Sequence, residues 1–110
     1  MASGKEFVEF CMEQMKGAGI ITNKRMFGEY GLYCNGKYFG AICEDQVFVK
    51  ITEAGRNACP GLTEKPPYEG RNNYFLFEDV EDTEKLTELV MATCRELPEP
   101  KPRKRKKKDE

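Results

Sequence analysis

The side chains best suited to chemistry in this 110-residue chain are its five cysteines, because the sequence contains no histidine. They stand at Cys11, Cys34, Cys43, Cys59 and Cys94. Their odd number and the lack of a Cys-x-x-Cys pair predict reduced thiols rather than a disulfide scaffold. Without histidine, no evident base activates a thiol. We therefore expect no catalytic residue, no metal, no cofactor and no enzymatic activity, and a cysteine-only metal site stays open as an alternative.

A second candidate for chemistry is a segment rich in glycine and aromatic residues, KRMFGEYGLYCNGKYFG, at residues 24–40. Such a segment is either a loop that grips phosphate or a pair of strands joined by a turn. Its GEYG matches the G-x-x-G loop of KH domains, but that loop joins two helices and strands flank it here. Walker and Rossmann fingerprints are absent. Asn35-Gly36 is instead a strong hairpin signal, because a type I′ turn needs positive φ at both central residues.

Six consecutive basic residues lie near the C-terminus, in a segment whose charge differs from the rest of the chain. Residues 98–110 hold seven of the 18 basic and three of the 19 acidic residues, so they carry +4 and the remainder −5. We expect a folded domain at residues 1–97 and a disordered basic tail at residues 98–110. The tail either binds nucleic acid weakly, with a Kd of roughly 10⁻⁴ to 10⁻⁶ M, or only aids solubility. The candidate contacts are Arg103, Lys104, Arg105, Lys106, Lys107 and Lys108.

Apolar residues spaced three to four apart predict an amphipathic helix near each end of the domain. The first spans residues 3–16, with Ser3 as its N-cap. The last begins at residue 82 or 83 and runs to about residue 97. A shorter helix over residues 53–59 follows Thr52, which can cap it.

Strand signals alternate with turns between these helices. Residues 24–34 and 37–43 flank the Asn-Gly turn, and Glu44-Asp45 makes a second tight turn before a strand at residues 46–51. Residues 73–79, NYFLFED, predict a further strand, and EKPPYEG before it is an irregular or edge segment because of its prolines. The fold class is therefore α+β in two layers, with an antiparallel sheet of about five strands and three helices in the order α-β-β-β-α-β-β-α.

The turns also predict a strand register. If Asn35-Gly36 is a two-residue loop, Leu32 lies opposite Phe39 and Gly31 lies opposite Gly40. The two glycines would form a notch on one face of the sheet, where a helix can approach closely. We assign that face to the helices.

The opposite face of the sheet is the candidate partner-binding surface. Because side chains alternate along a strand, the predicted register places Tyr30, Leu32, Phe39 and Phe48 together on this face. An uncovered apolar face of a few hundred Å² is unusual on a monomer and favours a protein partner or a homodimer. The alternative is that loops or the last helix cover it, or that a bulge at Gly28 changes the register.

The N-terminus and the hydropathy predict the location of the protein. No apolar run approaches the roughly 20 residues of a membrane span. The N-terminal MASGKEFVEF lacks the basic start and apolar core of a secretory signal. We expect a soluble cytoplasmic protein with no membrane contact.

Residues 25–33, RMFGEYGLY, together with the strand at residues 38–42, resemble the TfoX N-terminal domain family. Residues 47–56, VFVKITEAGR, and the NYFLFED strand extend the resemblance, which covers about residues 4–97. The resemblance implies a two-layer α+β fold. It also implies a role related to TfoX/Sxy regulators of competence genes, which act beside a cyclic-AMP-receptor-type activator. Those regulators carry a second, helical domain where this chain has its basic tail, so we expect a stand-alone N-terminal domain.

Two functional hypotheses follow. The first is a non-enzymatic regulatory module that acts through contact with a protein; by resemblance, the partner is a transcription activator or an RNA polymerase-associated protein. The second is an accessory nucleic-acid-binding protein that uses its basic tail. An enzyme ranks below both hypotheses.

Overall fold

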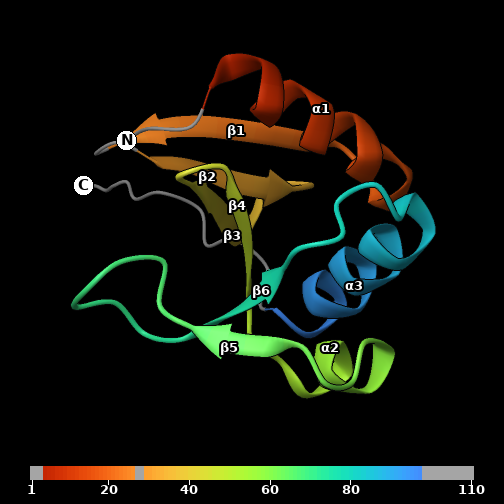
Figure 1. Ribbon diagram of the computed structural model, residues 1–110. Coiled ribbons are helices and arrows are strands. Elements are labelled where there is room, and N and C mark those ends of the chain that lie inside the picture. Colours follow the sequence, from red (N-terminus) through yellow and green to blue (C-terminus); the bar gives the residue numbers. More distant parts are fainter. Residues whose placement is uncertain (1–3, 27–28, 98–110) are drawn as a thin grey trace, which may run out of the picture.

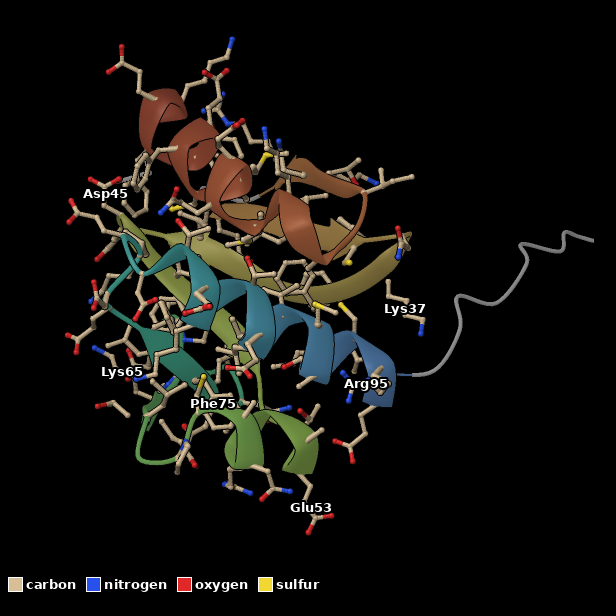
Figure 2. The ribbon with its side chains drawn as sticks, turned by 90° about the vertical axis from the view of Figure 1, so that its right-hand side faces the viewer. Lys37, Asp45, Glu53, Lys65, Phe75 and Arg95 are labelled. Carbon is tan, nitrogen blue, oxygen red and sulfur yellow. The ribbon has the colours of Figure 1, made fainter. Side chains whose placement is uncertain are left out.

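The computed structural model describes residues 4–26 and 29–97. Three helices lie on one side of a six-stranded antiparallel sheet (Figures 1 and 2). The helices are α1 (Lys5–Met15), α2 (Glu53–Ala58) and α3 (Thr83–Glu96), with a short 3₁₀ helix η1 (Lys16–Ala18) after α1. The strands are β1 (Ile21–Met26), β2 (Glu29–Cys34), β3 (Lys37–Cys43), β4 (Gln46–Lys50), β5 (Thr63–Lys65) and β6 (Tyr74–Phe77), in the spatial order β1-β2-β3-β4-β6-β5. The predicted two-layer α+β fold is confirmed, with six strands in place of about five.

The additional strand is β1, which the sequence pattern missed. We expected one strand over residues 24–34, but this stretch contains the end of β1 and all of β2. The two strands pair antiparallel from Ile21 opposite Cys34 to Met26 opposite Glu29. The alternative of a bulge at Gly28 and the prediction of Ser3 as a helix cap concern residues outside the described part of the chain. Gly4 is the N-cap of α1, and it makes no side-chain capping bond.

Both predicted two-residue turns are confirmed. Asn35 and Gly36 have φ of 53° and 86°, the positive values that a type I′ turn requires. Glu44 and Asp45 adopt φ of 53° and 60° without a glycine. The second turn joins Cys43 to its partner Gln46, and the pairing of β3 with β4 places Gly40 opposite Val49.

The register between β2 and β3 differs from the prediction because β3 contains a bulge. Tyr33 lies opposite Tyr38, but Leu32 lies opposite Gly40 rather than opposite Phe39, as the prediction had it. Phe39 is therefore an extra residue on β3, and every pair beyond it is shifted by one position. Gly31 pairs with Ala41, so the predicted notch of two facing glycines is wrong.

The bulge brings Gly40 against the backbone of β4. A Cβ atom at Gly40 would lie 2.1 Å from the carbonyl oxygen of Phe48. Real Cβ atoms do not approach a backbone oxygen this closely, so the strand needs glycine here for space rather than for an unusual φ.

The main core lies between the sheet and the helices. The apolar stripe of α1 contributes Val8, Cys11 and Met15, all buried. The sheet residues in this core are Leu32, Cys34, Phe39, Ile42, Val47, Val49, Phe75 and Phe77. A smaller buried cluster on the other face of the sheet contains Cys43, Phe48, Tyr74 and Leu76.

Side-chain caps fix two helices where the sequence predicted them. The Thr52 hydroxyl accepts a hydrogen bond from the Gly55 amide at 2.9 Å, which caps α2. The Asp82 carboxylate accepts one from the Lys85 amide at 3.1 Å, which caps α3. Among the described residues, no helix has both the length and the apolar character that crossing a bilayer requires.

Candidate functional site

The four residues predicted to bind a partner do not form an exposed patch. Leu32, Phe39 and Phe48 are each 0% exposed, and Tyr30 is only partly exposed. Tyr30, Leu32 and Phe39 pack on the helix side of the sheet, whereas Phe48 belongs to the cluster on the opposite side. The prediction that they share one open face is wrong, because the bulge at Phe39 shifts the alternation of side chains along β3.

The six basic residues of the predicted nucleic-acid contact lie outside the described residues. The described part of the chain ends at Leu97, directly after the last residue of α3, Glu96.

The five cysteines are buried free thiols, each held in the core. Burial, aided by the negative charge of Asp45, raises the pKa of Cys11 to about 12. Burial and the neighbouring Cys34 thiol raise the pKa of Cys94 to about 12. A thiol is nucleophilic only as the thiolate, so these two side chains are unreactive near neutral pH. In the described part of the chain, no three Cys, Asp or Glu side chains are grouped so as to hold a metal ion.

This arrangement predicts slow thiol modification. With Ellman's reagent at pH 8, we expect the folded chain to react slowly at all five cysteines and the denatured chain to react at once, because burial limits access and suppresses the thiolate.

The raised pKa values also stabilise the fold only while the thiols stay protonated. Stability from Cys11 and Cys94 is therefore full below pH 9 and is lost as the pH rises toward 12. Rapid labelling of a cysteine in the native chain would contradict its burial.

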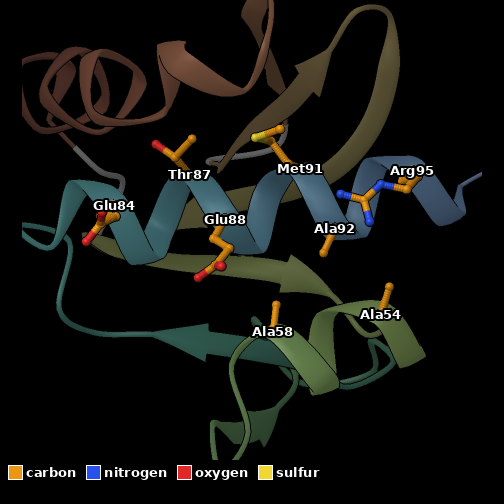
Figure 3. Close-up of a pocket in the computed structure, with 8 residues that line it drawn as sticks. All are labelled: Ala54, Ala58, Glu84, Thr87, Glu88, Met91, Ala92 and Arg95. Atoms are coloured by element: carbon orange, nitrogen blue, oxygen red, sulfur yellow. The ribbon is translucent and has the colours of Figure 1, made fainter.

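A groove lies between α2 and α3. It encloses about 470 Å³. Ala54 and Ala58 of α2 point toward α3, where Ala92 points back toward them (Figure 3). These small side chains leave room for a guest. Met91, with 44% of its surface exposed, borders the groove and provides an adaptable apolar contact.

The two ends of this groove carry opposite charges. Glu84 and Glu88 line the part nearer the start of α3, and Arg95 lines the part near its end (Figure 3). The two helices that form the groove are tied together where Glu96 accepts a hydrogen bond from the Ala54 amide at 3.1 Å. The groove is therefore an apolar channel with acidic groups at one end and a cation at the other.

The sequence did not reveal the groove, although it predicted both helices. An alanine every fourth residue on α2 is the one available signal, since Ala54 and Ala58 fall on the same helix face. Which helix that face meets depends on tertiary packing.

The described residues form a small α+β domain with a groove between α2 and α3. The sequence model of the TfoX N-terminal domain matches residues 13–96. The chain belongs to the TfoX N-terminal domain family. It is also 35% identical to an uncharacterized 12.7 kDa protein in the trpE 5′ region of Spirochaeta aurantia, over 98% of this chain and 95% of that protein.

Proposed function

We propose that this chain is a non-enzymatic regulatory module that acts by binding another protein in the groove between α2 and α3. The observation that carries the proposal is the exposed Met91 beside a floor of alanines, in a domain whose other large apolar side chains are mostly buried. Apolar anchors set in a groove of this kind suit an amphipathic helix of a partner protein. Membership of the TfoX N-terminal domain family supports a role in transcriptional regulation of competence genes.

The charges of the groove define the chemistry of the guest. Glu84 and Glu88 would form complementary contacts with a basic residue at one end of the bound helix. Arg95 would do so with an acidic residue at the other end. The partner that the family role favours is a cyclic-AMP-receptor-type activator or an RNA polymerase-associated protein. We place this interaction in the cytoplasm, which suits a chain with five free thiols.

The proposal predicts that Met91→Glu weakens capture of the purified activator or polymerase by the immobilised full chain at least tenfold. The glutamate would place a charge against the apolar floor, and the fold should survive because Met91 is exposed. Capture should be measured after nuclease treatment, which removes any nucleic acid that bridges the two proteins.

Phe10→Glu is the matched control. Phe10 is 42% exposed on α1, so this variant makes a similar change from an apolar to an acidic side chain outside the groove. It should leave capture unchanged. Equal loss in both variants, or capture that disappears with nuclease alone, would contradict the proposed contact.

A further inference from the structure

We propose that the face of the sheet opposite the helices binds single-stranded nucleic acid. This proposal is independent of the groove between α2 and α3. It begins from a row of touching side chains that crosses this face from β2 to the connection between β5 and β6. In order of contact they are Tyr33, Tyr38, Tyr74, Arg71 and Tyr68, which we call the tyrosine row.

Each side chain of the tyrosine row contacts the next, and these contacts hold the row in place. The rings of Tyr33 and Tyr38 meet edge to face with centroids 5.5 Å apart. The hydroxyls of Tyr38 and Tyr74 lie 3.3 Å apart, and Tyr74 accepts a hydrogen bond from Arg71 at 2.8 Å. Rings that are fixed before a ligand arrives lose little entropy on binding.

Arg71 fixes the far end of the row. Its guanidinium donates a hydrogen bond to the Tyr68 hydroxyl at 2.9 Å and stacks on the Tyr68 ring at 5.2 Å. Tyr68 remains 42% exposed, and Tyr33 is partly exposed at the other end. The row therefore presents an accessible aromatic ring at each end. Aromatic rings on an open sheet are surfaces on which unpaired bases stack, whatever their sequence.

Cations accompany the tyrosine row. The Lys50 ammonium lies 5.3 Å from the centre of the Tyr38 ring and forms no ion pair within residues 4–26 and 29–97. Lys50 and Lys65 both pair with Tyr74 across neighbouring strands, so all three share this face. Lys24 lies on the same face. Residues paired across neighbouring strands share a face, and the pairs Lys24–Gly31, Gly31–Ala41 and Ala41–Phe48 connect Lys24 to Phe48, which lies on the face opposite the helices.

Carboxylates are sparse on the same face. Of the strand residues described, Glu29 is the one carboxylate that points to this side, and Arg71 neutralises it at 3.0 Å. The helical layer instead carries many of the acidic side chains of the domain, including Glu9, Glu13, Glu84 and Glu88. Positive charge beside aromatic rings matches a flexible phosphate chain with exposed bases, and the acidic helical layer would repel it.

The test is fluorescence anisotropy of the full chain at low salt with labelled oligo(dT), oligo(U) and a duplex of equal length. We expect tighter binding to the single strands than to the duplex. Tyr33→Ala should weaken single-strand binding about tenfold, the scale of one lost base stack. Lys50→Glu should weaken it about as much, and the two single-stranded probes distinguish DNA from RNA.

Two controls separate the sheet face from other sources of binding. Lys85→Glu makes the same charge change as Lys50→Glu, but at an exposed position of α3. It should weaken single-strand binding much less. A full-length variant with glutamine at all six positions 103–108 removes the tail cations. It should weaken single strands and duplex alike and keep the preference for single strands.

Several results would overturn the proposal. One is equal weakening by Lys50→Glu and Lys85→Glu, which would indicate general charge attraction. Another is loss of the single-strand preference in the tail variant, which would assign the contact to residues 103–108. A third is undiminished binding by folded Tyr33→Ala. Met91→Glu should not affect nucleic-acid binding. A negative result for the sheet face therefore does not contradict the groove proposal, and a negative result for the groove does not contradict the sheet-face proposal.

Discussion

A chain with alanine in place of Gly40 is expected to lose about 3 kcal/mol of unfolding free energy. The added Cβ would lie 2.1 Å from the Phe48 carbonyl oxygen and 3.1 Å from the Val49 Cα atom. Both atoms belong to the backbone of the adjacent strand, so no side-chain rotation relieves the overlap. β3 must separate from β4, or the bulge must disappear and move the buried Phe39 out of register. Urea denaturation followed by circular dichroism measures the effect.

Gly4→Ala is the control for this substitution. A Cβ atom at Gly4 has no neighbour within 4 Å, and Gly4 has an ordinary extended φ of −74°. Its replacement should change the unfolding free energy by less than about 1 kcal/mol. Equal stability of the two variants would show that β3 and β4 do not approach as closely as described here.

The second large effect is expected at Arg71. Arg71→Met should destabilise the domain by about 3 kcal/mol, because it leaves the carboxylate of Glu29 buried without its cation. Glu29 is only 3% exposed and bonds Arg71 through one oxygen at 3.0 Å. Its other oxygen, Oε1, has no hydrogen-bond partner, so Arg71 is its one strong compensation among the described residues. Chemical denaturation at neutral pH measures the loss.

A double-mutant cycle checks the cause of this loss. Adding Glu29→Gln to Arg71→Met removes the orphaned charge and should recover part of the stability. Arg56→Met is the matched control, since Arg56 pairs with Glu64 at 3.0 Å on the surface and should contribute less than about 1 kcal/mol. Additive effects at Arg71 and Glu29 would show that the two residues are not coupled.

Local signals carried the parts of the fold that could be predicted. Asn35-Gly36 and Glu44-Asp45 set their turns through backbone conformation, which depends on the residues themselves. Thr52 and Asp82 cap helices through bonds that span three residues. Each of these features is decided within a few positions of the chain, and each appears where the sequence placed it.

The features that were missed depend on residues far apart in the sequence. β1 reads ITNKRM, and its mostly polar residues suit an edge strand that only its pairing with β2 reveals. The bulge at Phe39 depends on how β3 packs between β2 and β4. Arg71 lies in an irregular segment and meets Glu29 across 42 positions. The predicted partner surface was wrong for the same reason, because one extra residue in β3 puts Tyr30, Leu32 and Phe39 on the opposite face from Phe48.

The strand order has a consequence for self-association. With β1 and β5 at its borders, the sheet ends on two strands whose unpaired backbone groups would otherwise template a neighbouring chain. β5 is only three residues long and carries Glu64 and Lys65, and β1 carries Lys24 and Arg25. The short length of β5 and the charged side chains of β1 disfavour the addition of a strand from another chain. We therefore expect a homodimer of this chain to use its side-chain surfaces rather than a sheet continued from one copy to the next.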